Sequence, residues 1–180
     1  MNKFRAVTAG AVLCASVFLA GCEGGVPFVQ GNPPKMPEGW SAGAEITFGS
    51  NKAQAEVTRT GPGCWDFLFT EPPELSGIEM KLENGTLTAS LGELSAEAGG
   101  GDFTILPKLI AEGIDSIDAA GFTERDGVLT AKITASGSSC TVTADSATGN
   151  ILSFKSPGNK LAAYFSDVTP YTEEVGLVEE

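Results

Sequence analysis

The chain has 180 residues, of which 23 are acidic, 11 are basic and none is histidine, so its formal net charge is −12. Such an acidic protein is repelled by nucleic-acid phosphates and by anionic lipid head groups, which excludes DNA or RNA binding as its main role. The lack of histidine removes the commonest general base and metal ligand.

The first 21 residues have the pattern of a signal peptide. Lys3 and Arg5 precede an apolar run without charges over residues 6–20, a basic start and apolar centre typical of secretory signals. The run is shorter than the about 20 residues that a membrane-spanning helix needs. It ends at L-A-G-C, residues 19–22, followed by E-G-G-V-P.

The L-A-G-C stretch resembles the bacterial lipobox, in which the cysteine thiol is acylated and the chain is cut before it. The resemblance implies that Cys22 becomes the first mature residue and carries fatty acids such as palmitate, and two or more acyl chains anchor a protein stably. We therefore expect lipid anchoring at the extracytoplasmic face of a cell membrane. The alternative is an ordinary secreted protein in which Cys22 is incidental, and the kind of envelope stays open.

Residues 22–41 are predicted to be a tether. Prolines at positions 27, 33, 34 and 37 lie among several glycines, so neither a helix nor a strand ladder can run through this segment. At roughly 3 Å per residue in an extended form, the tether could hold the body up to about 50 Å from the membrane. The acidic tail over residues 171–180 is predicted to be frayed.

In the body between the tether and the tail, apolar residues recur at every second position, which is typical of half-buried strands. Apolar side chains alternate with polar ones in four runs: Ala53–Val57, Ile78–Leu82, Leu87–Leu91 and Leu129–Ala135. Turn sequences such as Asn84-Gly85 and Asp126-Gly127 separate such runs, and short turns join antiparallel neighbours. The sequence therefore predicts an antiparallel meander with one solvent-exposed face and one buried, or dry, face.

One segment, residues 104–121, breaks this period and predicts a helix. Pro107 lies near its start, Gly121 lies where it would end, and Gly113 weakens it by about 1 kcal/mol relative to alanine. Its apolar residues recur at helical spacing: Leu106, Leu109, Ile110, Ile114 and Ile117. We expect this stripe to cover the dry face, because no other predicted element is left to do so. The fold class is mostly β with one principal helix, a curved antiparallel half-barrel of about nine or ten strands.

The stretch V-T-R-T-G-P-G-C-W-D-F-L-F-T-E-P-P-E-L-S-G-I-E-M, residues 57–80, resembles the strand, strand, proline and L-x-G turn of lipoproteins with the LolA-like fold. That family includes outer-membrane lipoprotein carriers, mycobacterial lipid-binding lipoproteins and spore-germination lipoproteins. A proline-started helix and further strands follow in the family's order, so the resemblance covers most of residues 42–170. The chain lacks the long amphipathic helix that usually precedes the first strand of the carriers.

The resemblance implies binding of a lipid or a lipoprotein acyl chain in the half-barrel. The candidate cavity residues are the bulky dry-side residues of strands and helix: Trp65, Phe67, Phe69, Met80, Leu82, Leu109, Ile110, Phe154 and Phe165. Alanines beside them, such as Ala55 and Ala131, leave space either for close packing of the helix or for an apolar cavity. Both alternatives remain open at this point.

No catalytic constellation or cofactor motif is present. Asp115 and Asp118 lie on the polar side of the predicted helix and are interpreted as a solvated face rather than as a paired-carboxylate site. No metal site, no cofactor and no enzyme activity are expected. A disulfide between Cys64 and Cys140 is permitted in an exported protein, but strand parity puts the two thiols on opposite faces of the sheet.

Three functions are therefore considered. The first is a tethered module that binds an apolar ligand. The second is a non-catalytic scaffold whose strand edge or convex face binds an envelope protein, such as the cell-wall hydrolase that the germination lipoproteins suggest. The third is an enzyme of unfamiliar chemistry. An apolar cavity of several hundred cubic ångströms would favour the first.

Overall fold

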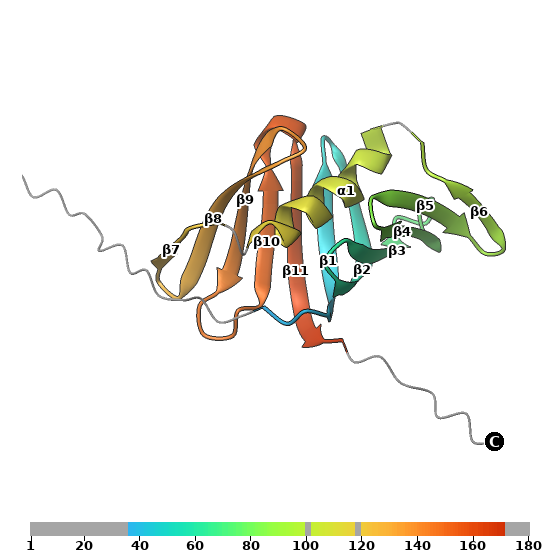
Figure 1. Ribbon diagram of the computed structural model, residues 1–180. Helices are drawn as coiled ribbons and strands as arrows, with labels where there is room; N and C mark the ends of the chain where they lie inside the picture. Colours follow the sequence, from blue (N-terminus) through green and yellow to red (C-terminus); the bar gives the residue numbers. More distant parts are fainter. Residues whose placement is uncertain (1–35, 100–101, 118–119, 172–180) are drawn as a thin grey trace, which may run out of the picture.

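An eleven-stranded antiparallel sheet curves around one α-helix in the computed structural model (Figure 1), which describes residues 36–99, 102–117 and 120–171. The sequence predicted nine or ten strands; the edge strands have only four residues each, too few for a periodic pattern. The elements are β1 (Trp40–Phe48), β2 (Asn51–Gly61), β3 (Cys64–Glu71), β4 (Ile78–Glu83), β5 (Thr86–Leu91), β6 (Leu94–Glu97), α1 (Asp102–Asp115), β7 (Phe122–Arg125), β8 (Val128–Ala135), β9 (Ser138–Asp145), β10 (Ile151–Ser156), the 3-10 helix η2 (Pro157–Asn159) and β11 (Leu161–Pro170).

The sheet consists of two meanders joined at the middle. Its strand order is β6-β5-β4-β3-β2-β1-β11-β10-β9-β8-β7, so every neighbour is also a neighbour in sequence except the antiparallel pair β1 and β11. The first meander ends at one edge of the sheet and the second begins at the other. Helix α1 carries the chain between these edges and crosses the concave face on the way (Figure 1).

The predicted period-two runs lie in β2, β4, β5 and β8. In β2, for example, Ala53, Ala55 and Val57 are buried and the residues between them are exposed. The hairpin turns also follow the sequence, since Asn84-Gly85 and Asp126-Gly127 all have positive φ, the conformation of a two-residue hairpin turn. Local chemistry therefore predicts the meander correctly.

Helix α1 places its predicted apolar stripe on the sheet. Leu106, Leu109, Ile110, Ile114 and Ile117 are all buried, the last of them just beyond the helix. The helix begins at Asp102 rather than at the proline, and Pro107 lies inside its first half. This proline removes one backbone hydrogen bond of the helix. Burial of the apolar residues before and after the proline offsets that loss.

The core extends beyond the predicted domain boundary at its start. Strand β1 begins at Trp40, which is completely buried although the sequence assigned it to the tether. Its ring contacts Trp65 edge to face at 5.4 Å between centroids, and Phe165 in the same manner at 5.6 Å. These contacts join β1, β3 and β11 across the middle of the sheet.

Among the described residues, no helix is long and apolar enough to cross a membrane.

Gly113 of α1 faces the sheet at a point of close packing. A Cβ built there would lie 3.2 Å from Ile133 Cδ1 and 3.1 Å from Phe154 Cδ2, and closer still to Phe154 Cε2. Phe154 is completely buried, so its ring has little room to move. The glycine therefore lets the helix approach the sheet.

We expect Gly113→Ala to lower the free energy of unfolding by about 1–2 kcal/mol, because overpacking outweighs the gain of about 1 kcal/mol in helix propensity. Chemical denaturation measures the change. Gly121→Ala is the control, since among the described residues no atom other than those of its chain neighbours lies within 4 Å of its Cβ position, and its effect should stay within about 0.5 kcal/mol. A stabilised Gly113→Ala protein would contradict the close-packing account.

Candidate functional site

The nine predicted cavity residues all lie in the buried core between helix and sheet. None is more than 8% exposed, and they belong to one continuous cluster: Trp65, Phe67, Phe69, Met80, Leu82, Leu109, Ile110, Phe154 and Phe165. The rings of Trp65 and Phe67 stack with their centroids 6.0 Å apart. Between the two alternatives that the sequence left open, these nine residues form a packed core.

Asp115, at the end of α1, connects the helix to the β2–β3 hairpin. Its carboxylate accepts hydrogen bonds from Arg59 Nε at 2.8 Å, from the Gly63 backbone N–H at 2.8 Å and from Trp65 Nε1 at 3.0 Å. The ion pair is largely shielded, with side-chain exposures of 9% for Arg59 and 17% for Asp115. The interpretation of Asp115 as part of a solvated face is therefore wrong; Asp118 lies outside the described residues.

Arg59 makes further contacts that hold its guanidinium in place. Its Nη1 donates to the backbone carbonyl of Glu38, and its Cζ lies 5.7 Å from the centroid of the Trp65 ring. Periodicity could not reveal this pair, because the partners are 56 residues apart in sequence. The pair fixes the last turn of α1 beside β2 and β3.

A second polar contact ties the helix to the other half of the sheet. Glu112 accepts a hydrogen bond from the Ser136 backbone N–H at 2.9 Å and another from the Ser136 hydroxyl. Ser136 lies in the turn between β8 and β9. The C-terminal half of α1 is thus bonded to both meanders.

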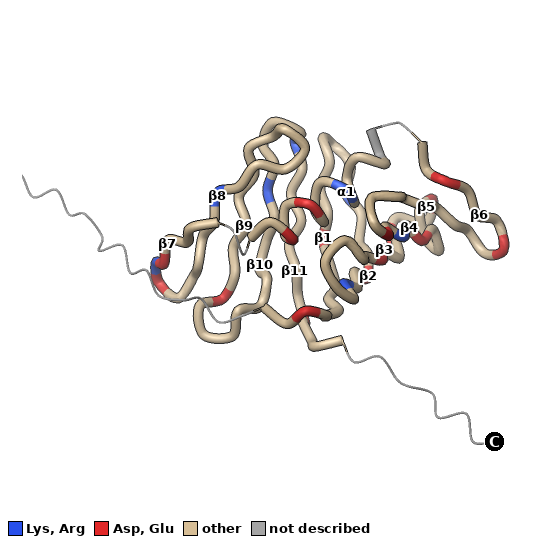
Figure 2. Tube along the Cα trace, in the orientation of Figure 1, with Lys and Arg blue, Asp and Glu red and all other residues tan. Residues whose placement is uncertain are grey.

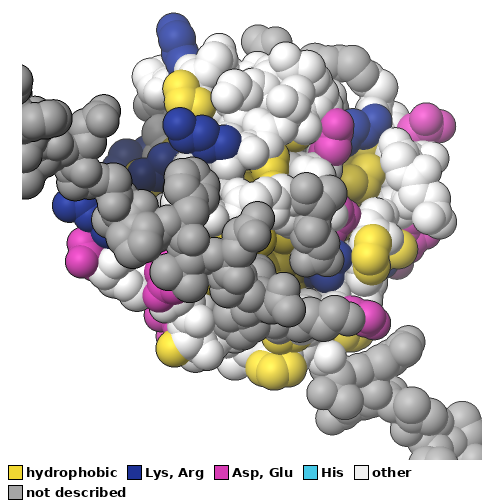
Figure 3. Space-filling model, turned by 60° about the vertical axis from the view of Figure 1, so that its left-hand side comes forward, with side chains coloured by type: hydrophobic (Ala, Val, Ile, Leu, Met, Phe, Trp, Pro, Cys, Tyr) yellow, Lys and Arg dark blue, Asp and Glu magenta, His cyan; other side chains and the backbone are white. Residues whose placement is uncertain are grey.

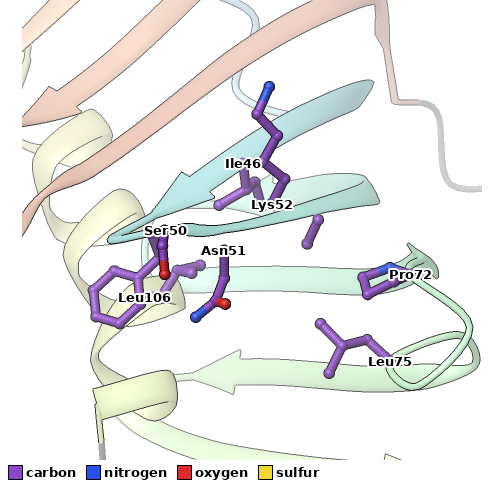
Figure 4. A pocket seen from close by; sticks show the side chains of 9 residues that line it. Ile46, Ser50, Asn51, Lys52, Pro72, Leu75 and Leu106 are labelled. Atoms are coloured by element: carbon purple, nitrogen blue, oxygen red, sulfur yellow. The ribbon is translucent and has the colours of Figure 1, made fainter.

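An apolar pocket of about 450 Å³ lies toward the N-terminal half of α1 (Figure 4). Leu106 of the helix forms one side, and Pro72 and Leu75 of the β3–β4 loop lie opposite it. The rest of the lining comes from the β1–β2 hairpin: Ile46, Phe48, Ser50, Asn51, Lys52 and Ala53. Its volume is within the range of about 300–1,000 Å³ that small-molecule sites occupy.

The polar groups of the pocket are gathered at the β1–β2 turn. In Figure 4 the side chain of Asn51 points into the space between Leu106 and the Pro72–Leu75 loop, whereas the side chain of Lys52 points away from it. The Lys52 ammonium group lies 3.4 Å from Glu45 Oε1 in an exposed ion pair. The pocket therefore combines an apolar lining with neutral hydrogen-bonding groups at one side.

None of the nine predicted cavity residues lines this pocket. Among its lining residues, the helical repeat predicted burial of Leu106, and the strand alternation predicted burial of Ala53. Phe48, Pro72 and Leu75 have no periodic signal, because they belong to a strand end and a loop. The pocket could not be located from the sequence, since it depends on where the first turns of the helix lie on the sheet.

Cys64 and Cys140 are both free. Cys64 is half-buried in β3 and Cys140 is buried in β9, with four strands between theirs in the sheet. A disulfide requires Cα atoms within about 7 Å, so the pair that the sequence permitted is too far apart to form. The predicted opposite orientation of the two thiols agrees with their different burial.

Several predictions fall outside the described residues. These are the signal peptide, the lipidation of Cys22, most of the tether and nearly all of the acidic tail. Among the residues that are described, no group of three His, Cys, Asp or Glu side chains could hold a metal ion.

No protein-family model matches the chain, and no curated protein matches it. Its fold is similar to that of an uncharacterized conserved protein from Thermus thermophilus, with a TM-score of 0.49, 10% identity and coverage of 76% of this chain and 81% of the other. It is also similar to a LolA superfamily protein from Nitrosomonas europaea, with a TM-score of 0.41, 9% identity and coverage of 77% and 89%.

A third similar structure, from Vibrio parahaemolyticus, is named for outer membrane lipoprotein sorting, with a TM-score of 0.41, 10% identity and coverage of 81% and 89%. The structure itself shows the curved antiparallel half-barrel with one principal helix that the sequence predicted. At these identities the similarities concern the fold alone.

We expect Asp115→Asn to lower the free energy of unfolding by about 3 kcal/mol, because the shielded Arg59 guanidinium loses its counter-charge. Thermal and urea denaturation measure the loss. Glu45→Gln is the matched control in an exposed pair and should cost less than about 1 kcal/mol. Equal effects of the two substitutions would show that Asp115 does not anchor the helix.

Proposed function

We propose that this protein is a membrane-anchored extracytoplasmic lipoprotein that binds an apolar ligand, such as a lipid or a lipoprotein acyl chain. The observation that carries the proposal is the apolar pocket of about 450 Å³ beside Leu106. Its lining is contributed by the helix, a hairpin and a loop, so the folded chain forms it as a unit. The proposed role is binding and not catalysis.

The pocket fits an amphiphile better than a fully apolar molecule. Ile46, Phe48 and Leu75 supply surface from which a hydrocarbon chain would displace water. Ser50 and Asn51 supply a hydroxyl and an amide, which can bond a carbonyl or hydroxyl of the ligand at the mouth. Lys52 turns toward Glu45, so a charged head group is not required.

A second candidate function, the scaffold for an envelope protein, is favoured by a different observation. The predicted cavity residues are all buried in one cluster between helix and sheet, whereas a protein partner would bind at exposed surface. Strand β6 at the sheet edge is exposed at all four residues. Cavity binding and edge binding use different residues and can be tested separately.

The binding proposal predicts that the chain, purified without added lipid, binds an apolar fluorescent probe that long-chain fatty acids displace. Ala53→Phe should fill the pocket and weaken binding by roughly tenfold or more, and Leu75→Ser should weaken it by removing apolar contact. Titration followed by fluorescence, with native mass spectrometry for co-purified lipid, gives the readout.

Ala162→Phe is the matched control, because Ala162 lies in β11 outside the pocket lining. It should leave probe affinity unchanged. Absence of both a lipid adduct and saturable probe binding would exclude the pocket as a ligand site.

The anchoring proposal predicts that Cys22→Ser abolishes incorporation of labelled palmitate in bacterial cells and releases the protein from the membrane fraction. The physical reason is that the thiol is the only group at this position able to form the thioether to diacylglycerol. Cys64→Ser should keep both the label and the membrane location. Label retained by Cys22→Ser would contradict the assignment.

A further inference from the structure

The apolar concave face of the sheet continues past the helix into the β5–β6 hairpin. Leu91 of β5 pairs with Ile78 of β4 on one side and with Leu94 of β6 on the other. Leu91 is 53% exposed and Leu94 is 76% exposed. They border a shallow recess of about 450 Å³ that is lined mainly by apolar side chains of β4, β5 and β6. This surface is separate from the pocket beside Leu106.

Strand β6 also presents unpaired backbone groups. It is the last strand on its side of the sheet in the described part of the chain. The Ala98 N–H bonds the Leu87 carbonyl at 2.8 Å, and antiparallel bonding alternates along a strand. By this parity Leu94 and Ala96 bond to β5, whereas the N–H and C=O groups of Ser95 point outward. The edge can therefore accept another strand.

The residues around this edge are strongly acidic. Residues 64–98 hold seven acids, Asp66, Glu71, Glu74, Glu79, Glu83, Glu93 and Glu97, and one base, Lys81. Figure 2 shows these acids along β3–β6. Residues 122–161 hold four bases and three acids, and Figure 3, which brings that side forward, shows blue and magenta side chains mixed.

The surrounding charges also affect the pKa of Asp66 in β3. Burial raises the pKa of this carboxyl, Lys81 lowers it, and the negative charges of Glu79 and Glu83 raise it again. The single lysine thus leaves the neighbouring acids without a balancing charge. A cation brought to this half of the sheet would be attracted.

We propose that β6 is a docking edge for an extended basic segment of a partner protein, which adds to the sheet as a further antiparallel or parallel strand. Apolar side chains at alternate positions of the segment would extend the concave row beyond Leu94 and Ala96. Lysine or arginine side chains at the intervening positions would lie on the convex side near Glu97. The partner is thus a strand with alternating apolar and basic residues.

Charge selects this partner over two others. A second copy of the chain would bring Glu93 and Glu97 of one hairpin against the same acids of the other, which repel each other. An anionic lipid surface would be repelled by the same acids. This inference does not depend on a ligand in the pocket beside Leu106.

The test uses the full chain in a non-ionic detergent and two fluorescent peptides, K-V-K-V-K-V-K and E-V-E-V-E-V-E. Fluorescence anisotropy should show saturable binding of the lysine peptide that weakens as salt rises, and no binding of the glutamate peptide. Equal binding of both peptides, or of neither, would overturn the proposal.

Ser95→Pro removes an N–H group that points away from β5, so no hydrogen bond to β5 is lost. Edge strands tolerate proline at such positions. It should weaken lysine-peptide binding by roughly tenfold or more while circular dichroism and Tm stay unchanged. Glu124→Pro is the matched control on the opposite edge of the sheet. Arg125 pairs with Val128 across the Asp126-Gly127 turn, so the backbone N–H of Glu124 points away from β8, as that of Ser95 points away from β5. It should bind the peptide like the natural sequence.

Two further variants keep the test decisive if Ser95→Pro misfolds. The pair Glu93→Gln and Glu97→Gln should weaken binding and flatten its salt dependence, and Leu94→Ser should weaken binding at every salt concentration. Unchanged binding in all of these variants would place the peptide elsewhere and overturn the proposal. A dimer in light scattering that Ser95→Pro dissociates would instead make β6 an interface between copies and would also overturn it.

Discussion

The structure depends on a mismatch in length between one helix and the sheet that it must cover. A helix of 14 residues is about 21 Å long, whereas eleven strands spaced about 4.8 Å apart span about 48 Å along the sheet. Curvature brings the two halves of the sheet toward the helix, and the large side chains of the middle strands fill the space between them. The helix covers the centre, and the apolar face beyond it remains uncovered toward β6. The packed core and the exposed Leu91 and Leu94 thus have a common cause.

Polar contacts decide where along the sheet the short helix lies. Asp115 binds the hairpin between β2 and β3, and Glu112 binds the turn between β8 and β9. Each contact joins α1 to a different meander, so together they hold the two halves of the sheet at one spacing. Apolar packing is non-directional, and it would allow the helix to slide along the concave face. The buried ion pair with Arg59 opposes such sliding, because moving the helix would leave a shielded charge without its partner.

Two surfaces of different chemistry result. The pocket beside Leu106 is apolar, with neutral polar groups at the β1–β2 turn, and suits a chain-like amphiphile. The edge at β6 joins an apolar row to unpaired backbone groups and a surplus of acids, and suits a strand with basic side chains. The β3–β4 loop, with Leu75, leads from the pocket into the strand that carries Ile78, a lining residue of the second recess. The two proposed binding surfaces therefore use different residues of the sheet.

The sequence by itself determined which face of each alternating strand and of the helix turns inward, because alternation in a strand and the 3.6-residue repeat of a helix are local properties. It did not show the burial of Trp40 or Arg59. The nine bulky residues assigned to the dry side are all buried, and the two-residue turns lie where Asn-Gly and Asp-Gly occur. Tertiary structure alone decided whether those residues enclose a cavity, because that depends on how closely Gly113 lets the helix approach Phe154. It also decided the role of Asp115 and the separation of Cys64 from Cys140. Such pairings join residues far apart in the chain, and no local repeat records them.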